Sequence, residues 1–264
     1  MFDSSILNVD SVAFHINDKI ILEKITFKIA EKDILCIVGP NGSGKSTLIK
    51  LLTQENRPTF GSIYFQNNLL ENWCKNNIAK KRAVLSQLNN LSFPFKVMDI
   101  IKMGRYPFNN DFFNNSQIEL SKEIIEIFDL NKFLDQNYLT LSGGEKQRVQ
   151  LARVFMQLWS EKDYFDGKIV ILDEPDSFLD IKHQQVLFKF LKRLNEKGLT
   201  IIMVLHDLNL SMMNSNKILM LKDARQVAFG DTRKKMNKKN IFKCFGIETN
   251  KFKFENNEYI TYRN

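Results

Sequence analysis

The stretch "DILCIVGPNGSGKSTLIKLL", from Asp33 to Leu52, decides the fold. It runs from a short apolar segment through a glycine-rich turn into a segment with the apolar spacing of a helix. This is the strand, loop and helix order of a phosphate-binding loop, or P-loop. Gly39, Gly42 and Gly44 let the backbone curl so that successive N–H groups can point at phosphate oxygens. The stretch therefore predicts an α/β protein that holds phosphate groups at the start of a helix.

The side chains of this loop predict how a nucleotide and its metal ion are held. Lys45 supplies a point charge for the β and γ phosphates, and the Ser46 hydroxyl is placed to ligate Mg²⁺. With the flanking strand and helix in the expected order, the pattern favours phosphate binding over an ordinary glycine-rich turn. The predicted nucleotide-binding residues of the loop are Gly39, Pro40, Asn41, Gly42, Ser43, Gly44, Lys45, Ser46 and Thr47.

A second apolar segment, "KIVILDEPDSFLD" from Lys168 to Asp180, contains two adjacent acids. Its consecutive apolar residues indicate a strand buried on both faces of a parallel sheet. Asp173 is expected at the carboxyl end of this strand, where ligands sit in open α/β sheets, and is placed to hold Mg²⁺ with Ser46. Glu174 follows directly, and a carboxylate beside the metal suits a general base that takes a proton from an attacking water.

The segment "GLTIIMVLHDLNL" supplies another buried strand, which is followed by His206. A lone histidine is usually structural. At the carboxyl end of a sheet strand, however, this one would reach the same edge as Asp173 and could contact the γ phosphate.

Two glycines interrupt the stretch "LSGGEKQRV", residues 141–149, just before a long amphipathic pattern. Ser142 and Glu145 have the spacing of a capping box, which would explain a helix start. A capping box does not require Gly143 and Gly144, which each cost about 1 kcal/mol of helix propensity relative to alanine. Because they leave the helix start free of side chains, the stretch predicts a second anion site made of N–H groups and a serine hydroxyl.

These motifs, in this order and over nearly the whole chain, resemble those of the ATP-binding cassette (ABC) ATPases; they are Gly39 to Thr47, Leu141 to Gln147, Leu172 to Pro175 and His206. The resemblance implies a P-loop α/β core with an antiparallel β subdomain and a helical subdomain. It also implies ATP and Mg²⁺ as cofactors, and a homodimer that closes over ATP. In that dimer, Ser142, Gly143 and Gly144 of one copy contact the γ phosphate held by the P-loop of the other.

Further positions carry over by the same resemblance. Phe14 matches the aromatic residue that stacks on adenine, although the family more often has tyrosine there. Gln87 matches the glutamine that senses Mg²⁺, and Asp180 matches the aspartate that links the two sites across the dimer. Asp176 departs from the usual threonine or alanine after "DEP" and adds a negative charge. The implied catalytic residues are Glu174, His206 and Gln87, and the implied metal ligands are Ser46, Gln87 and Asp173.

The segment from Leu91 to Phe108, "LSFPFKVMDIIKMGRYPF", lies where ABC ATPases touch their membrane subunits. Together with "QRVQLARVFMQLW" and the insert "SEKDYFDGK", it resembles the ATPase subunits of bacterial haem importers. Siderophore and cobalamin importers share much of this pattern. The resemblance implies two transmembrane permease subunits and, indirectly, a periplasmic or surface haem-binding protein. It places the chain peripherally on the cytoplasmic face of the inner membrane.

Two readings outside transport are weighed against the importer. An iron–sulfur assembly ATPase would carry the same motifs, but the "FPF" and "GRYP" pieces favour an importer. A nucleotide-gated scaffold without activity conflicts with the presence of Glu174 and His206.

Composition sets broad limits on the protein. With 44% apolar residues, the 264-residue chain can bury a core, and its apolar runs are too short to span a membrane. The N-terminal residues lack the layout of a secretory signal, and Cys36, Cys74 and Cys244 are scattered as reduced thiols would be. The net charge of +8 follows a bias towards lysine and asparagine throughout the chain, so we expect a solvated basic surface and no nucleic-acid partner.

We expect a single ABC ATPase domain over residues 1–264. Residues 1–87 and 161–230 would form the β subdomain and P-loop core, 88–160 the helical signature subdomain, and 231–264 a C-terminal extension. Antiparallel strands are expected within 1–32 and 58–66. The stretch "MLKDARQVAFG", residues 220–230, predicts a hairpin, although Ala224 stands where its turn would prefer glycine.

Overall fold

The computed structural model describes residues 5–86, 93–108, 115–159, 164–255 and 257–262. Its chain forms two compact units, Met1–Trp73 with Thr200–Asn264, and Cys74–Leu199. Both units combine strands with helices, so the predicted α/β class is confirmed. Among the described residues, no helix has the length and apolar character needed to cross a membrane.

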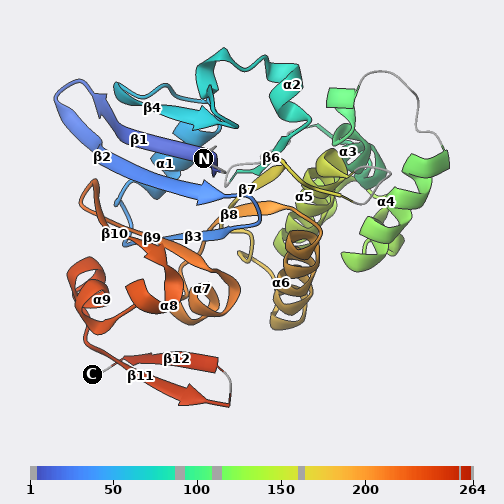
Figure 1. Ribbon diagram of the computed structural model, residues 1–264. Coiled ribbons are helices and arrows are strands. Elements are labelled where there is room, and N and C mark those ends of the chain that lie inside the picture. The colour runs from blue at the N-terminus through green and yellow to red at the C-terminus, as the bar shows by residue number, and fades with distance from the viewer. Residues whose placement is uncertain (1–4, 87–92, 109–114, 160–163, 256, 263–264) are drawn as a thin grey trace. The chain divides into compact units, whose positions relative to one another are not determined.

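The first unit is built on a mixed sheet (Figure 1) with the strand order β5-β4-β1-β2-β10-β9-β3-β8. Its strands are β1 (Ser5–Ile16), β2 (Lys19–Ala30), β3 (Ile34–Val38), β4 (Phe60–Phe65), β5 (Asn68–Leu69), β8 (Thr200–Val204), β9 (Lys217–Lys222), β10 (Arg225–Asp231), β11 (Thr249–Phe254) and β12 (Asn257–Tyr262). Its helices are α1 (Lys45–Leu52), α7 (Leu208–Asn214), α8 (Thr232–Lys235), α9 (Lys238–Phe245) and the 3₁₀ turn Leu70–Asn72.

The N-terminal strands form the antiparallel part of this sheet. β1 pairs with β2 on one side and with β4 on the other, both in antiparallel register. The inward-facing residues of β1 and β2, among them Val9, Val12 and Leu22, are fully buried. The antiparallel strands predicted within residues 1–32 and 58–66 are therefore confirmed.

The strand that leads into the P-loop lies at the centre of a parallel group. β3 pairs in parallel with β8 on one side and β9 on the other. Leu35, Cys36, Ile37 and Val38 have no exposed surface, which is the burial expected of a strand covered on both faces. Since parallel strands end at the same edge, the P-loop and the segment after β8 leave the sheet together.

The predicted hairpin at residues 220–230 is formed by β9 and β10. Asp223 and Ala224 make its turn with φ angles of 47° and 65°. Two consecutive residues in the left-handed region characterise the hairpin turn that normally contains glycine, so Ala224 adopts a conformation that costs an L-residue free energy. The Ala224 carbonyl accepts a hydrogen bond of 2.8 Å from the Glu23 N–H, which holds the turn against β2.

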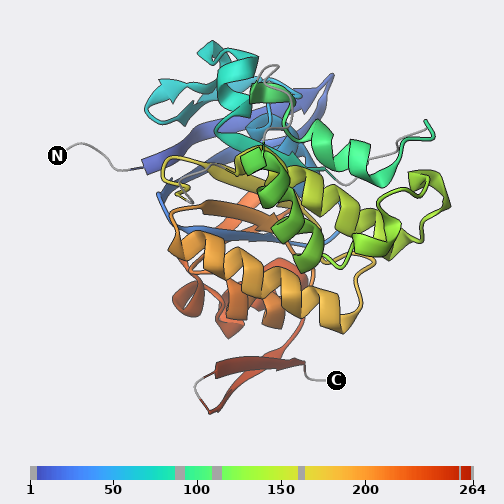
Figure 2. The same ribbon diagram turned by 90° about the vertical axis from the view of Figure 1, so that its right-hand side faces the viewer.

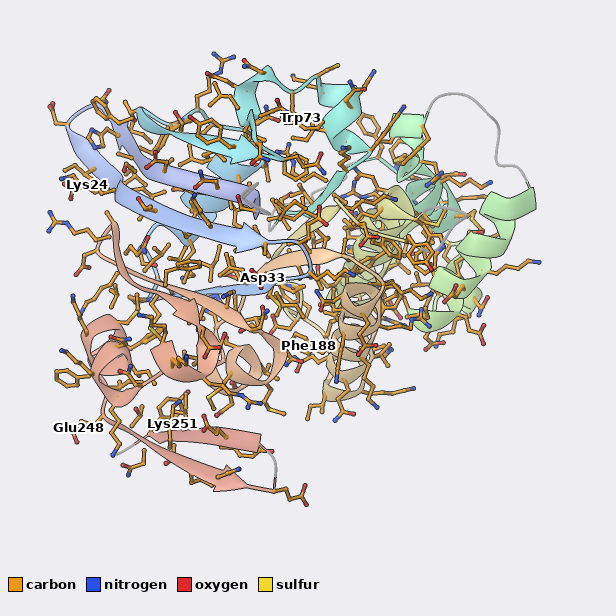
Figure 3. The ribbon with its side chains drawn as sticks, in the orientation of Figure 1. Lys24, Asp33, Trp73, Phe188, Glu248 and Lys251 are labelled. Carbon is orange, nitrogen blue, oxygen red and sulfur yellow. The ribbon has the colours of Figure 1, made fainter. Side chains whose placement is uncertain are left out.

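The C-terminal strands β11 and β12 form a separate two-stranded sheet. Asn209 of α7 binds the backbone of Ile260 in β12 through two hydrogen bonds. Its side-chain oxygen accepts from the Ile260 N–H at 2.7 Å, and its side-chain nitrogen donates to the Ile260 carbonyl at 3.1 Å. Lys251, labelled in Figure 3, donates to the Arg233 carbonyl at 3.0 Å. The hairpin is therefore anchored to the helices that precede it.

The second unit contains the parallel strand pair β6 and β7 and a group of helices, which Figure 2 shows face on. Its elements are α2 (Lys75–Ala79), β6 (Arg82–Leu85), α3 (Val97–Met103), α4 (Asn115–Ile127), α5 (Gly143–Leu158), β7 (Ile169–Asp173), α6 (Ile181–Glu196) and the 3₁₀ turns Tyr106–Phe108, Asn131–Phe133 and Tyr138–Thr140.

An aromatic cluster fixes α5 within this unit. The rings of Phe128 and Phe155 stack 5.9 Å apart, and Phe190 of α6 meets Phe155 edge to face at 4.9 Å. Trp159, just after α5, stacks on Phe190 at 6.2 Å. Such pairs each contribute about 0.5–1.5 kcal/mol beyond the burial of their area. Helix α5, which begins at the paired glycines, is thus held on the side that faces α4 and α6.

Candidate functional site

The P-loop residues of the first unit form a tight turn into α1. Gly44 is the N-cap of this helix, with a φ of 101°. A Cβ at Gly44 would lie 2.5 Å from Leu22 Cδ2 and 2.9 Å from the Ile21 carbonyl oxygen, so no larger residue fits without moving β2. Asn41 and Gly42 are exposed at the tip of the turn. The loop backbone is therefore positioned by its packing on β2, and its tip is accessible.

Two polar groups of this loop fit an anionic ligand. Lys45 is 7% exposed as a residue, and its ammonium donates to the carbonyl oxygens of Gly39 at 2.8 Å and Pro40 at 3.1 Å. Ser43 is 2% exposed, and within the described part of the chain its hydroxyl has no hydrogen-bond partner. A buried hydroxyl of this kind ordinarily has one. A phosphate at this loop would supply it, and would give Lys45 a charged acceptor. Ser46, the predicted metal ligand, is exposed, and Thr47 is half-buried.

Two further predicted residues of the first unit lie on or directly after strands that carry or contact this loop. Half-buried Phe14 pairs across β1 and β2 with Leu22, the residue against which Gly44 packs. His206 follows β8, in which Val204 pairs with Ile37 of β3. His206 is exposed, and it leaves the sheet at the same edge as the P-loop. The first unit therefore brings together an aromatic ring, the phosphate loop and a histidine.

In the second unit, β7 ends at Asp173, as predicted, with its side chain buried. Glu174 follows with a φ of 50°. A glutamate in the left-handed region stores strain of about 1–3 kcal/mol, which proteins concentrate at functional sites. The left-handed backbone at Glu174 ends the extended conformation of β7 at Asp173.

Two residues that sequence reasoning missed hold this strained turn. Gln147 of α5 donates from Nε2 to the carbonyl oxygens of Glu174 at 3.4 Å and Pro175 at 3.2 Å. The Ser177 hydroxyl donates to Glu174 Oε2 at 3.4 Å. The sequence signals were weak: Gln147 is the last residue of the motif from Leu141 to Gln147 but was given no role of its own, and Ser177 lies three residues after Glu174. The helix that starts at Ser142 thus supports the predicted general base directly.

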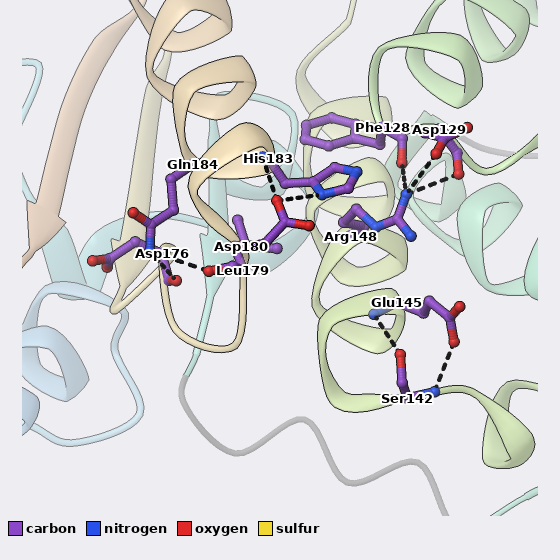
Figure 4. A network of polar contacts seen from close by, with 10 residues as sticks. All are labelled: Phe128, Asp129, Ser142, Glu145, Arg148, Asp176, Leu179, Asp180, His183 and Gln184. Atoms are coloured by element: carbon purple, nitrogen blue, oxygen red, sulfur yellow. Dashed lines mark hydrogen bonds and ion pairs between the residues drawn. The ribbon is translucent and has the colours of Figure 1, made fainter.

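The predicted capping box at the start of α5 is confirmed (Figure 4). The Ser142 oxygen accepts from the Glu145 N–H at 3.4 Å, and Glu145 Oε2 accepts from the Ser142 N–H at 2.8 Å. This backbone hydrogen bond from Ser142 lowers the pKa of Glu145, so its carboxylate stays charged. A hydrogen bond from the Ser142 hydroxyl lowers the pKa of Glu145 further, so the serine side chain is tied to Glu145 in both directions. Ser142 and Gly143 are both exposed.

The paired glycines have an additional role that the sequence analysis did not anticipate. A Cβ at Gly144 would lie 2.7 Å from the Phe178 carbonyl oxygen, whereas the nearest atom to a Cβ at Gly143 is on the Phe178 ring at 3.4 Å. Gly144 is thus required by the close approach of the loop after β7. The need for a helix start without side chains therefore explains chiefly Gly143, whereas close packing on Phe178 explains Gly144.

This difference predicts opposite outcomes for two matched substitutions. Gly144→Ala should lower the free energy of unfolding by about 1–3 kcal/mol, the usual cost of an overpacked contact. Gly143→Ala should be neutral or raise it by up to about 1 kcal/mol, since alanine favours the helix and its Cβ meets the Phe178 ring only at the ordinary contact distance of 3.4 Å. Urea unfolding of the two variants measures both changes. Equal stability of the two would contradict the packing described here.

Asp180 is the N-cap of α6. One of its oxygens accepts from the His183 N–H and lies against His183 Nδ1, both at 2.8 Å. The hydrogen bond from the His183 backbone, followed by that from its ring, lowers the pKa of Asp180. The carboxylate is thus oriented by its own helix. Its predicted role across a dimer stays a prediction.

The predicted residues therefore fall into two groups, one in each unit. The first unit carries Phe14, the P-loop from Gly39 to Thr47 and His206, and the second carries Ser142, Gly143, Gly144, Asp173, Glu174 and Asp180. Gln87, predicted to sense Mg²⁺, lies outside the described residues.

Comparison with known sequences gives matches over most of the chain. The ABC transporter family model matches residues 22–177. The hemin import ATP-binding protein HmuV of Rhodopseudomonas palustris (strain BisB5) is 36% identical over 227 residues, which cover 86% of this chain and 85% of the relative. HmuV of Escherichia coli O157:H7 is 32% identical over 243 residues, covering 92% and 93% of the two chains.

Solved structures share the fold. An inward-facing metal-chelate type ABC transporter matches with a TM-score of 0.78 at 24% identity, covering 98% of this chain and 97% of that one. The dimeric ATP-binding cassette MJ0796, bound to ADP and phosphate, matches with a TM-score of 0.74 at 24% identity and covers 86% and 99%. At these identities the likeness concerns the fold alone.

Proposed function

Because the chain belongs to the ABC transporter family, we propose that it is the ATP-hydrolysing subunit of an importer and that the imported substrate is haem. The observation that carries the choice of haem is the set of curated relatives at 32–36% identity, each a hemin import ATP-binding protein. The proposal places a homodimer of this chain on two transmembrane permease subunits, at the cytoplasmic face of the inner membrane. A periplasmic or surface haem-binding protein delivers the substrate.

Binding of ATP is assigned to the first unit. The adenine stacks on Phe14, the P-loop N–H groups and Ser43 receive phosphate oxygens, and Lys45 exchanges its carbonyl acceptors for the β and γ phosphates. The exchange is favourable because a charge-assisted hydrogen bond is stronger than one between an ammonium and a neutral carbonyl. Phe14 lacks the hydroxyl of the tyrosine more usual in the family, but stacking does not need it.

Hydrolysis is assigned to groups on both units. Mg²⁺, which the proposal gives to Ser46, Gln87 and Asp173, would neutralise charge on the phosphate oxygens. Glu174 takes the proton from the attacking water, and the hydrogen bonds from Gln147 hold the backbone that carries it. His206 donates to the γ phosphate. Ser142 and Gly143 act on ATP that is held by the other copy, so hydrolysis requires the closed dimer.

Import of a siderophore or of cobalamin is the alternative within the same mechanism. An iron–sulfur assembly role is the alternative outside transport. All these roles use the ATPase site described above. The importers differ from one another in the permease and its cargo, whereas the iron–sulfur role involves no permease.

Growth on defined iron sources tests the function. Deletion of the gene in its own organism should abolish growth on haem as the sole iron source and leave growth on ferric siderophores and on cobalamin-dependent media unchanged. The wild-type gene should restore growth. Lys45→Ala should not, because loss of a charged hydrogen bond of about 1.5–3 kcal/mol lowers ATP affinity roughly 10- to 100-fold. Normal growth of the deletion strain on haem would refute the haem assignment, and unchanged ATP affinity of Lys45→Ala would refute the role of the loop.

A further inference from the structure

His206, to which the proposed function assigns the γ phosphate, lies between two stretches of backbone that are held by hydrogen bonds. Before it, the Leu205 N–H donates to the Ile37 carbonyl oxygen of β3 at 3.4 Å, so the sheet holds the chain up to Leu205. Directly after it, Asp207 is the N-cap of α7. The backbone of His206 is therefore fixed on one side by the sheet and on the other by the place where α7 begins.

The first turn of α7 is closely tied to Asp207. One side-chain oxygen of Asp207 accepts from the N–H groups of Asn209 at 2.6 Å and Leu210 at 2.9 Å. The Asp207 carbonyl oxygen accepts from the Ser211 N–H at 3.0 Å. On the inner side, the Cys36 thiol of β3 donates to the Ser211 hydroxyl at 3.3 Å. Because a helix of seven residues is too short to be stable by itself, its tertiary contacts decide where this turn lies.

Asn209, which is half-buried, attaches the same turn to the C-terminal hairpin. Its two side-chain hydrogen bonds, at 2.7 Å and 3.1 Å, engage both the N–H and the carbonyl oxygen of Ile260 in β12. The end of β12 also lies near the cap of the helix. Burial raises the pKa of the Tyr262 phenol, and the negative charge of Asp207 raises it as well. The strand therefore reaches both the cap residue of α7 and the side chain two positions after it.

The hairpin is in turn fixed to other elements of the first unit. A two-stranded hairpin is marginally stable in water by itself, so its position depends on such contacts. Lys238 of α9 donates to the Asn250 side-chain oxygen at 2.8 Å, and Lys251 donates to the Arg233 carbonyl of α8 at 3.0 Å. Ile260 is only 3% exposed. The hairpin thus gives the start of α7 an anchor on the C-terminal helices.

From these contacts we propose that Asn209 is a positioning residue, which holds the start of α7 on the C-terminal hairpin and thereby fixes the backbone that carries His206. This inference rests on the proposed function, which gives His206 its contact with the γ phosphate. Asn209 acts through the backbone and takes no part in the reaction itself. The hairpin of β11 and β12 acquires a role in hydrolysis, although it carries none of the nucleotide-binding motifs.

Hydrolysis kinetics and hydrogen–deuterium exchange of the full-length chain test this role together. In Asn209→Ala, exchange at residues 258–262 should be roughly 2- to 10-fold faster, the effect of losing one hydrogen bond. The kcat for ATP should fall at least about threefold and at most about 10²-fold, the cost of a misplacement of about 1 Å. Equilibrium affinity for ATP should stay within about twofold, because the P-loop and Phe14 bind the nucleotide.

Asn214→Ala is the matched control. It removes the same type of side chain from the other end of α7, where the Asn214 amide donates to the Leu210 carbonyl oxygen at 2.9 Å. This hydrogen bond lies within the helix and does not involve the hairpin. The variant should therefore keep the parent values of kcat, ATP affinity and exchange at 258–262.

The outcomes separate the inference from the proposed function. The positioning role is overturned, and the proposed function stands, if Asn209→Ala lowers kcat less than about threefold, leaves exchange at 258–262 unchanged, or loses ATP affinity in parallel with kcat. An equal fall of kcat in Asn214→Ala overturns it as well. His206→Ala tests the premise: hydrolysis at the parent rate would refute the role of His206 in the proposed function, and the inference with it.

A second variant keeps the test decisive if Asn209→Ala does not fold. Asn209→Asp retains an oxygen that can accept from the Ile260 N–H but has no N–H for the Ile260 carbonyl. Its kcat should fall while its affinity for ATP is retained. A kcat equal to that of the parent would overturn the inference.

Discussion

Glu174→Gln should bind ATP as the parent chain does and hydrolyse it at least about 10²-fold more slowly, the lower end of the range for a missing general base. Glutamine keeps the size of the side chain and can still accept from Ser177, but it cannot take a proton from water. The left-handed backbone at Glu174 and the hydrogen bond from Gln147 do not depend on the carboxylate. Steady-state phosphate release, measured beside ATP binding by equilibrium titration, separates the two effects.

A matched change gives the control for this experiment. Glu196→Gln alters an acid at the end of α6, which the site does not use, and should leave turnover within about twofold, as surface substitutions away from functional features do. If Glu174→Gln hydrolyses ATP at a near-normal rate, another group abstracts the proton and the assignment of Glu174 is wrong. If it fails to bind ATP, the substitution acts on the fold rather than on the chemistry.

Ser142→Arg should abolish ATP-dependent dimerisation while a single copy still binds ATP. The long cationic side chain would fill the exposed helix start that has to approach the nucleotide of the other copy. Size-exclusion chromatography with ATP in the Glu174→Gln background measures the loss of dimer. Ser142→Ala is the matched control, because both changes remove the capping hydroxyl at a cost of about 0.5–2 kcal/mol in stability but only arginine adds bulk and charge. A stable Ser142→Arg dimer would contradict the role of this surface.

The local features of the site could be predicted from the sequence because each depends on a few residues that are close together in the chain. The apolar run Ile169–Leu172 indicates a buried strand, and the spacing of Ser142 and Glu145 specifies a capping box; both are present, the strand as Ile169–Asp173. The turn at Asp223 and Ala224 forms although alanine is poorly suited to it, since the pairing of β9 with β10 outweighs the cost of its backbone conformation.

The features that escaped prediction depend on contacts between distant residues. Nothing in the sequence near Gly144 shows that the Phe178 carbonyl approaches it, or that Gln147 reaches the backbone at Glu174. Likewise, nothing in "GRYP" indicates that Arg105 caps a helix that ends more than fifty residues later. The left-handed φ of Glu174 is a consequence of such tertiary packing, because a glutamate has no local preference for it.

The central claim is that two copies of this chain enclose each ATP, the P-loop of one facing the helix start of the other. Cross-linking tests it most directly in a chain that carries Glu174→Gln, Cys74→Ser, Asn41→Cys and Lys146→Cys. Cys74 is the exposed native thiol and has to be removed, whereas Cys36 and Cys244 are buried. A short bis-maleimide should then yield a covalent dimer with ATP, little without it, and none when either new cysteine is omitted or Ser142→Arg is added. A chain that stays monomeric on a denaturing gel at saturating ATP, or that cross-links only within itself, would contradict the account.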